Sequence, residues 1–472
     1  MATISSPGIG SGLDIKSIVS QLVAIEKQPL TQLQVQAATV QTRISAFGQI
    51  KSLVSTLSDA ASRLGSLTTF NAVTAASSNN DTVSATAIGG TAVNSFSVKV
   101  ENLAKAQATA SAALLPVGGA LGAGTLRLQL GEWTIVPSSF TPQSGGGQVD
   151  IVVSATDTVS DVASKINGAG AGVTATVLND ASGERLLLRS NNTGVAAGFE
   201  LSIVSDADGD PADAAGLSRL VNGSSIQYAE DARMLINTIP VTSSTNKFEN
   251  VVSGVTLTAK AVSADAAEVT VAKDRSVLTQ AIDSFVSAYN AVNQAINEQT
   301  KYDPSSKEAG LLQGDATAIG LQNALRGILQ SATSGSAYER LADVGITQQL
   351  GGDLAVDSAK LEAAINNGDE LKNLLRIDNG NALTNGVASK FSAFAKGLLA
   401  TDGLFSSKDA SLKRSLERNA DDQARLNDKV ARVDAALNRR YSALDVQLSS
   451  LNALNAYVTQ QVTLWNQSSS SK

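Results

Sequence analysis

"GIGSGLDIKSIVSQLVAIEKQPL" (Gly8–Leu30) places three alternating glycines directly before a run with helical periodicity. The glycines are spaced G-x-G-x-G, which differs from the G-x-G-x-x-G of dinucleotide-binding folds. No strand-like run precedes them, and no Lys-Ser/Thr pair of a phosphate-binding loop follows them. Ser11 is placed to cap the coming helix, with Asp14 three residues later as in a capping box. We therefore expect the glycines to lead into a helix and to bind no phosphate.

Apolar side chains recur after the glycines in steps of three and four residues. Such a repeat forms one seam along a helix, and the seam packs against a partner helix. Pro29 interrupts the pattern, and we expect a break there, because proline lacks the backbone N–H and its ring clashes with the preceding turn. The predicted contact residues on this helix are Ile15, Ile18, Leu22, Ile25, Leu33, Val40 and Ile44.

The C-terminal end carries a second seam with strict four-three spacing over about four heptads. A helix over about 408–466 would be ~88 Å long, which is too long for a compact domain. We therefore expect this seam to pair with the N-terminal one as a coiled coil, although a buried helix of an ordinary bundle has the same periodicity. Asn455 on the seam is typical of a polar position that fixes register. The predicted contact residues are Leu437, Tyr441, Leu444, Leu448, Leu451, Asn455, Val458 and Val462.

Residues 72–272 differ from both ends, because apolar and polar residues alternate there between turns rich in Gly, Asn, Ser and Pro. Within this region Thr158 and Asp161 match a capping box that opens a short helix, which we expect to end at Gly168. The Gly/Ser-rich stretch Pro137–Gln148 is predicted to be a loop. The sequence thus predicts an α+β multidomain fold, in which the outer pieces of the chain form a helical layer and β-rich domains are inserted between them.

Composition excludes several classes of function. The chain contains no cysteine and no histidine, which removes thiol nucleophiles, disulfides, Cys/His metal sites and the usual general base near neutral pH. No apolar run reaches the ~20 residues of a membrane span, and the first residues lack the basic and apolar regions of a secretory signal. Residues 71–230 hold 7 basic and 14 acidic side chains, so they offer no basic footprint for nucleic acid.

Two short motifs resemble chemical sites but lack the residues that would complete them. "DADGDPAD" (Asp206–Asp213) resembles half a calcium loop, yet the sixth and twelfth positions are Pro211 and Leu217 instead of glycine and a carboxylate. Ser244 and Lys247 match S-x-x-K without the S-D-N and K-T-G motifs of the corresponding enzymes. We therefore expect no catalytic, cofactor-binding or metal site, and no enzymatic activity.

The opening stretch resembles the N-terminal signature of the bacterial flagellar filament cap proteins, which are hook-associated proteins. Lys165–Asn167 together with "GVTATV" (Gly172–Val177) resembles a motif shared among flagellar hook proteins and flagellins. Further stretches resemble the C-terminal half of the cap family in its order. They are "VTSSTNKFENVVSGVTL" (Val241–Leu257), "FVSAYNAVNQAI" (Phe285–Ile296), "GLLQGD" (Gly310–Asp315), "LADVGIT" (Leu341–Thr347) and "GDLAVD" (Gly352–Asp357).

The resemblance implies four domains, with both chain ends paired in one of them. Residues 1–45 with 435–472 are expected to form a terminal coiled-coil leg domain. Residues 46–71 with 231–434 are expected to form a helix-rich core domain with a β-hairpin region. Residues 72–115 with 200–230 are expected to form a β-rich outer domain, and 116–199 an inserted β-rich outer domain with one short helix.

The resemblance also implies a structural role at the distal end of the extracellular flagellar filament. There a homo-oligomeric ring, usually a pentamer, would promote the folding and polymerisation of flagellin and prevent its leakage. The chain would leave the cell through the flagellar type III export apparatus, with an export chaperone as a further partner. No cofactor, nucleic-acid partner or membrane insertion is implied.

Two other functions stay open on the sequence alone. One is a secreted adhesin whose β-rich domains bind host mucin or another host surface. The other is a different axial flagellar protein, such as a hook–filament junction protein or a flagellin-like protein. For the cap function, we hypothesise that Asn455 and the break at Pro29 weaken the helical seam and keep the leg adjustable during elongation.

Overall fold

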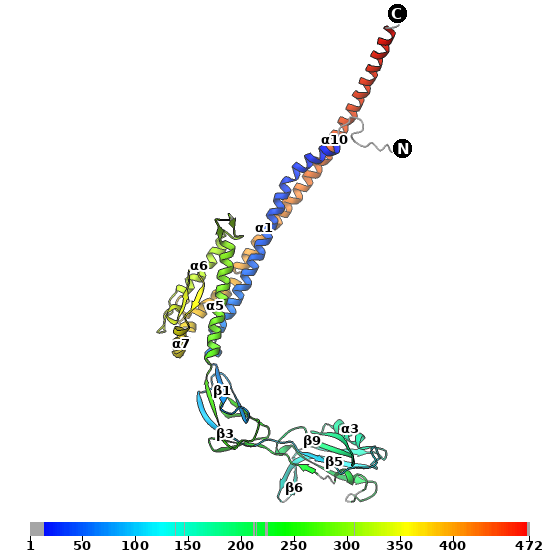
Figure 1. Ribbon diagram of the computed structural model, residues 1–472, viewed down its shortest axis with the longest axis vertical. Coiled ribbons are helices and arrows are strands. Elements are labelled where there is room, and N and C mark those ends of the chain that lie inside the picture. The colour runs from blue at the N-terminus through cyan, green and yellow to red at the C-terminus, as the bar shows by residue number, and fades with distance from the viewer. Residues whose placement is uncertain are drawn as a thin grey trace. The chain divides into compact units, whose positions relative to one another are not determined.

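The computed structural model describes residues 14–136, 138–145, 147–210, 213, 215–221, 225–305 and 307–469. The chain forms two compact units. The first joins Met1–Ser66 to Gln280–Lys472 and is mainly helical, whereas the second is Leu67–Thr279 and is built mainly of strands. This order of elements confirms the predicted α+β fold, with β-structure inserted between two helical parts of the chain (Figure 1).

The two longest helices of the first unit, α1 (Ile15–Leu64) and α10 (Leu404–Ser469), lie side by side (Figure 1). They are antiparallel, because residues with rising numbers in α1 contact residues with falling numbers in α10. The contacts pair Glu26 with Lys429, Leu33 with Asn419 and Phe47 with Lys408. Figure 1 also shows that α10 continues as a single helix beyond the start of α1.

Shorter elements pack against the C-terminal half of α1 and the start of α10. The core there includes an aromatic cluster in which Phe391 contacts Phe285 and Tyr289 edge-on, with ring centroids 5.1 and 6.0 Å apart. The helices are α5 (Arg275–Thr300), α6 (Ala316–Gln330), η2 (Leu341–Val344), α7 (Ser358–Asn366), α8 (Gly368–Arg376) and α9 (Val387–Leu399). Two hairpins join them, β17 (Tyr302–Asp303) with β18 (Glu308–Ala309), and β19 (Ile346–Gln348) with β20 (Leu354–Val356).

The second unit contains two separate hydrophobic cores. The first, which we call the first β-domain, lies between a five-stranded sheet of order β1-β16-β3-β12-β13 and a three-stranded sheet of order β14-β15-β2. All pairings are antiparallel, and alternate residues such as Val98, Val100, Met234 and Val269 are fully buried. The unit begins with a short helix, α2 (Leu67–Phe70). The strands are β1 (Val73–Ser77), β2 (Val83–Ala87), β3 (Asn94–Asn102), β12 (Ala232–Ile236), β13 (Ile239–Ser243), β14 (Lys247–Val252), β15 (Val255–Ala259) and β16 (Ala267–Lys273).

The second β-domain contains the other core, which α3 and two four-stranded sheets enclose. One sheet has the order β10-β5-β6 with β7 also paired to β5, and the other has the order β11-β4-β9-β8. The elements are β4 (Ala108–Ala110), β5 (Gly124–Ile135), β6 (Ser138–Pro142), β7 (Gln148–Val153), α3 (Val159–Ala169), β8 (Val173–Asp180), β9 (Gly183–Ser190), η1 (Val195–Ala197), β10 (Gly198–Asp206), α4 (Ser218–Val221) and β11 (Ser225–Gln227).

The predicted domain boundaries differ from the observed cores at two places. Residues 231–273, expected within the helix-rich domain, form strands that complete the first β-domain, since β16 pairs with β1 and β3 and β15 pairs with β2. The expected outer domain of 72–115 with 200–230 is divided between the two cores, because β10 pairs with β5 and β4 pairs with β9. These pairings join distant segments, and strand alternation carries no information about the partner strand.

Three local expectations are also corrected. The helix α1 continues through Pro29, which lies inside it as an exposed residue. The stretch Pro137–Gln148 is not simply a loop, because β6 pairs with β5 within it. The helix α3 has the predicted capping box at Thr158 and Asp161, but Gly168 lies inside it. The helix ends at Ala169, and the C-cap residue is Gly170 in the left-handed conformation (φ 63°).

Candidate functional site

The start of α1 is capped by an acidic side chain. Asp14 is the N-cap residue, since its carboxylate accepts the Ser17 N–H at 3.0 Å. The opening glycines and Ser11 lie outside the described residues. Asp14, which was expected at the third helical position after Ser11, is itself the N-cap residue. Its negative charge lies at the positive end of the helix dipole, which stabilises the helix start.

The predicted contact residues of α1 differ in burial. Ile15 is buried, and Ile18, Leu22, Leu33, Val40 and Ile44 are partly buried. Ile25, however, is 60% exposed, and its neighbour Glu26 instead bonds to Lys429 of α10 at 2.9 Å. Val19 is more buried than the predicted Ile18. The facing side of the helix therefore follows Ile15, Val19, Leu22, Glu26, Leu30 and Leu33, which includes two consecutive steps of four.

The predicted contact residues of α10 are less buried than those of α1. Leu437, Tyr441 and Leu448 are partly buried, whereas Leu444, Leu451, Asn455, Val458 and Val462 are exposed. The contacts that identify the partner of α1 all lie before residue 435 of α10. Within the described residues of one chain, the N-terminal helix thus pairs with an earlier part of α10 than the sequence predicts. Whether residues 444–462 contact another chain stays a prediction.

The part of the seam that pairs with α1 lies upstream of the predicted contact residues, although the sequence there has the same periodicity. The same four-three repeat continues upstream of Leu437, and each of its positions is buried or partly buried. Two of these positions are polar: Asn419 donates to the Leu33 carbonyl at 3.0 Å, and Gln423 donates to Asn419 at 2.6 Å. The upstream positions are Leu412, Leu416, Asn419, Gln423, Leu426, Val430 and Val433.

Beyond this paired region, α10 carries a large group of exposed apolar side chains. We call this group the terminal apolar face. Scattered apolar residues are common on protein surfaces, but a contiguous group on one helix marks an interaction site. It consists of Leu444, Leu451, Leu454, Val458 and Val462, which helical periodicity places on one side of α10 and each of which is at least 41% exposed.

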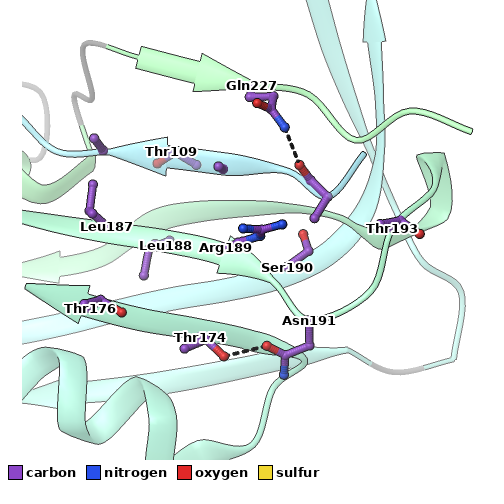
Figure 2. Close-up of a pocket in the computed structure, with 13 residues that line it drawn as sticks. Thr109, Thr174, Thr176, Leu187, Leu188, Arg189, Ser190, Asn191, Thr193 and Gln227 are labelled. Carbon is purple, nitrogen blue, oxygen red and sulfur yellow. Dashed lines mark hydrogen bonds between the residues drawn. The ribbon is translucent and has the colours of Figure 1, made fainter. Parts of the chain in front are cut away.

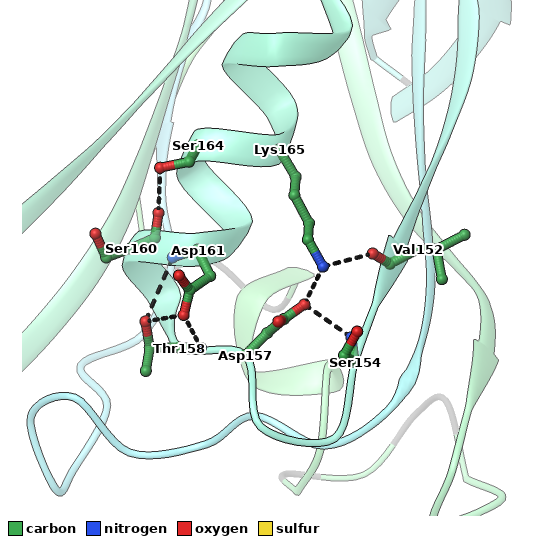
Figure 3. A network of polar contacts seen from close by, with 8 residues as sticks. All are labelled: Val152, Ser154, Asp157, Thr158, Ser160, Asp161, Ser164 and Lys165. Atoms are coloured by element: carbon green, nitrogen blue, oxygen red, sulfur yellow. Dashed lines mark hydrogen bonds and ion pairs between the residues drawn. The ribbon is translucent and has the colours of Figure 1, made fainter.

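A polar network fixes α3 to β7 in the second β-domain (Figure 3). Thr158 and Asp161 form the capping box at the start of the helix. Lys165, one turn later, pairs with Asp157 and donates to the Val152 carbonyl at 3.1 Å. The hydrogen bond from Lys165 is the largest of the causes that lower the pKa of Asp157. The network is a structural clamp, and it contains no nucleophile paired with a base.

A groove of about 750 Å³ lies on the sheet of β4, β8, β9 and β11 (Figure 2). Thr174 donates to the Asn191 side chain at 2.6 Å, and Gln227 donates to the Ala106 carbonyl at 3.1 Å. Among the residues that the structure describes, Arg189 is the only ionisable one that lines the groove. Hydroxyl and amide groups of this kind can exchange hydrogen bonds with a polar ligand, but they provide no acid–base pair for catalysis.

The two motifs that resembled chemical sites have ordinary structural roles where they are described. Asp206 accepts the Leu217 N–H at 2.7 Å, which closes an acidic turn. Lys247 pairs with Glu249 at 2.5 Å, and Ser244 accepts a hydrogen bond from Thr193 through its backbone carbonyl. The part of the chain that the structure covers has no group of three or more His, Cys, Asp or Glu residues placed to hold a metal ion. Among the same residues, no helix is both long and apolar enough to cross a membrane.

Comparisons with known proteins agree with the architecture. Two family models match most of the chain, the flagellar hook-associated protein 2 N-terminus at residues 11–107 and its C-terminus at residues 229–453. A third, the flagellin hook IN motif, matches residues 139–192, which include the clamp of α3. The match of the last model agrees with the resemblance seen around Lys165–Asn167.

Relatives and a solved structure extend the agreement to nearly the whole length. The flagellar hook-associated protein 2 of Escherichia coli K12 is 29% identical, and the B-type flagellar hook-associated protein 2 of Pseudomonas aeruginosa is 27% identical; each alignment covers 98% of both chains. The crystal structure of domains D1-D2-D3 of the flagellar cap protein FliD from Escherichia coli is similar with a TM-score of 0.60 at 27% identity, over 78% of this chain and 99% of that one. The order of helical and β-rich parts, the matched models and these relatives together place the chain in the flagellar hook-associated protein 2 family.

Proposed function

We propose that this protein is a structural cap at the distal tip of the bacterial flagellar filament, outside the cell. In this function several copies form a ring, contact the filament end, and promote the folding and polymerisation of flagellin while preventing its leakage. The family is one of flagellar cap proteins, and the protein acts by binding and positioning other chains without catalysing a reaction. A ring of five subunits, with the leg domain at 1–45 and 435–472, is our working model.

The observation that carries this proposal is the terminal apolar face of α10. Five large apolar side chains on this face are at least 41% exposed. Moving one such side chain from full exposure to full burial stabilises a protein or a complex by roughly 1.5–3 kcal/mol. An extended helix with this surface is suited to pack against other helices at the end of a filament, and the predicted contact residues Leu444, Leu451, Val458 and Val462 belong to it.

The paired region of α1 and α10 has a different property that the function requires. Its facing positions include the polar residues Glu26, Asn419 and Gln423. A seam with polar positions is less stable than a fully apolar one but keeps a defined register. Such a seam suits a cap whose legs hold the filament and still adjust each time a flagellin subunit is inserted beneath them.

We further propose that the chain reaches the tip through the flagellar type III export apparatus with the help of an export chaperone. The absence of cysteine supports this route, because a chain exported unfolded then has no thiol that can mispair. Binding to host mucin stays a prediction. The groove in Figure 2 supports it to the extent that a sugar would find hydroxyl and amide partners there.

The proposal is tested by deleting the gene in the source bacterium and measuring monomeric flagellin in the culture medium. We expect a large rise in unpolymerised flagellin and short or absent filaments, and complementation with the full chain should restore both. Filaments of normal length without leakage would refute the cap function. In that case adhesion to mucin-coated surfaces would be the next activity to measure.

A further inference from the structure

The hairpin of β19 and β20 holds an apolar side chain away from the molecule. Leu350 at its tip has a relative exposure of 106%, so almost nothing in its own chain covers it. Gly351 and Gly352 follow with φ of 99° each, a conformation that glycine adopts readily and other residues avoid. A Cβ on Gly352 would lie 2.8 Å from the Asn293 side chain and from the Arg326 guanidinium. The backbone of the tip is therefore in close contact with α5 and α6 beneath it.

Amide side chains on one face of α5 fix this tip in place. Asn290 exchanges two hydrogen bonds with the backbone of Leu354, at 2.6 and 2.9 Å. Asn293, which is buried, donates to the Gly351 carbonyl at 3.0 Å and to the Asp353 carboxylate at 2.8 Å. A tip held by this many bonds loses little conformational entropy when it docks. Two further amides bond to Asp353 and Gly351 at 2.7 and 3.0 Å, Gln294 and Asn297.

An apolar pocket of about 350 Å³ lies between α1 and α10 in the same compact unit. Its apolar walls come from Ile44, Phe47, Phe405 and Leu412, and both phenylalanines are themselves buried. Gly48 adds no side chain, and a Cβ placed on it would meet no atom within 4 Å. The pocket therefore stays accessible at Gly48, and Leu350 of the same chain is not among its lining residues.

The charges around the two features are complementary. Lys51 lines the pocket as an exposed residue and forms no ion pair within the described part of its chain. Asp409, the other charged residue of the lining, is already paired with Lys413 at 2.8 Å. The hairpin offers the carboxylate of Asp353, which is three residues from the exposed leucine and accepts hydrogen bonds from the Asn293 and Gln294 amides. Arg326 bonds to the tip through the Gly351 carbonyl at 3.3 Å. The Asp353 carboxylate therefore offers a negative charge that complements Lys51 of the pocket.

We propose that Leu350 of one copy inserts into the pocket formed by Ile44, Phe47, Phe405 and Leu412 of a neighbouring copy. This inference rests on the proposed function, in which several copies assemble. The hairpin and the pocket are different surfaces of the same chain, so the contact is head-to-tail. Such contacts generate a closed ring when the rotation between copies closes. The anchored hairpin and the open pocket are therefore the two halves of one repeated interface.

The absence of cysteine allows a direct test by disulfide trapping of the full chain. One preparation carries Leu350→Cys and a second, with a different affinity tag, carries Gly48→Cys. The two are mixed under conditions in which light scattering shows self-association, and are oxidised mildly. The control mixture replaces the first protein by Leu383→Cys, because Leu383 is also a highly exposed leucine of the same unit.

We expect a disulfide-linked dimer that contains both tags, in about tenfold or greater excess over the control mixture, because docking raises the effective concentration of the two thiols. Assemblies that form normally but cross-link no more than the control would overturn this contact and leave the cap function standing. A chain that does not self-associate under any condition would overturn both the contact and the proposed ring.

Variants that keep the fold provide a second measurement. Gly48→Trp fills the open pocket, whereas Gly48→Ala leaves it open and favours the helix. Leu350→Asp places a charge at the tip, with Leu383→Asp as its matched control. We expect Gly48→Trp and Leu350→Asp each to weaken self-association about tenfold or more, and the two controls to leave it unchanged. Equal association of all four variants would contradict the proposal.

Discussion

The two halves of α10 share one helix and one apolar repeat, but they have opposite surroundings. In the first half Phe405 and Val430 are buried, and α1 runs alongside. In the second half Leu451 and Val458 are 58% and 49% exposed. The first half thus contributes to the stability of the folded chain, whereas the apolar side chains of the second half are not covered by the described residues of the same chain. A hydrophobic repeat predicts which face of a helix will be covered, but not what will cover it.

The largest expected effect is a difference in protein stability between substitutions in the two halves of α10. Phe405→Ala should lower the free energy of unfolding by about 3–5 kcal/mol, because a buried phenylalanine leaves a cavity. Leu451→Ala should change it by less than about 0.5 kcal/mol, since the side chain is exposed in the single chain. Urea unfolding of purified proteins measures both. Filament length in cells is the complementary measurement, and there we expect Leu451→Ala to reduce elongation although the protein is as stable as the wild type.

A substantial loss of stability in Leu451→Ala would show that the second half is already packed within one chain. The contrast between the two halves would then be wrong.

A substitution of Pro29 tests α1, which is the partner helix of the first half of α10. It removes one backbone hydrogen bond inside α1 and crowds the preceding turn, so Pro29→Ala should stabilise the protein by about 1–3 kcal/mol. Gln28→Ala, at the neighbouring exposed position, is the matched control and should change stability by less than about 0.5 kcal/mol. Unfolding midpoints in urea provide the comparison. A destabilised Pro29→Ala protein would mean that the proline is compensated by a contact that depends on its ring.

An ion pair also joins the first half of α10 to α6, and its contribution to stability depends on pH. Lys408 donates to Asp315 at 2.7 Å, and the same carboxylate caps α6 by accepting the N–H groups of Thr317 and Ala318. Burial alone would raise the pKa of Asp315, but the bond to Lys408 together with the other favourable contacts outweighs it, so the pKa lies below its usual value. Asp315→Ala should therefore cost about 1–2 kcal/mol near neutral pH.

The sign of the pH effect follows from the lowered pKa. The stabilisation by Asp315 is fully present above the ordinary aspartate pKa of about 3.9 and is lost as the pH falls through the lower pKa of the folded state. The difference in unfolding free energy between the wild type and Asp315→Ala should accordingly shrink in acid. Asp409→Ala, which removes an exposed pair with Lys413, is the control and should show a small difference throughout. A gap that stays constant down to strong acid would contradict the assignment.

The sequence was sufficient for the local features of the fold. The capping box at Thr158 and Asp161 was correct because it depends on residues three apart. The division into helical ends and a β-rich middle was correct because the two periodicities differ. The limits of the β-domains were not, since β16 lies between β1 and β3, and no local pattern identifies which distant strands pair.

The candidate site shows the same limit at the level of single residues. The seam was placed on the correct helices, yet Ile25 is exposed and Glu26 faces α10, because a straight helix drifts relative to a regular four-three repeat. The four-three repeat from Leu412 to Val433 is present in the sequence, but two polar residues, Asn419 and Gln423, interrupt its apolar pattern. The exposed tip at Leu350 had no signal, since a single leucine between turn residues is indistinguishable from a buried one.

Asn455 gives the smallest expected change in stability and the sharpest test of the second half. It is exposed in the single chain, so Asn455→Leu should alter the free energy of unfolding by less than about 0.5 kcal/mol. In the assembled leg, however, a polar residue on the seam lowers affinity and fixes register, and leucine there should bind more tightly and adjust less readily. We therefore expect slower filament elongation from a protein of unchanged stability.

The control is Gln460→Leu, which lies off the predicted seam and should leave elongation unchanged. If Asn455→Leu also elongates filaments at the normal rate, adjustability of the leg does not depend on this position, and the polar residues Glu26, Asn419 and Gln423 of the paired half become the ones to substitute.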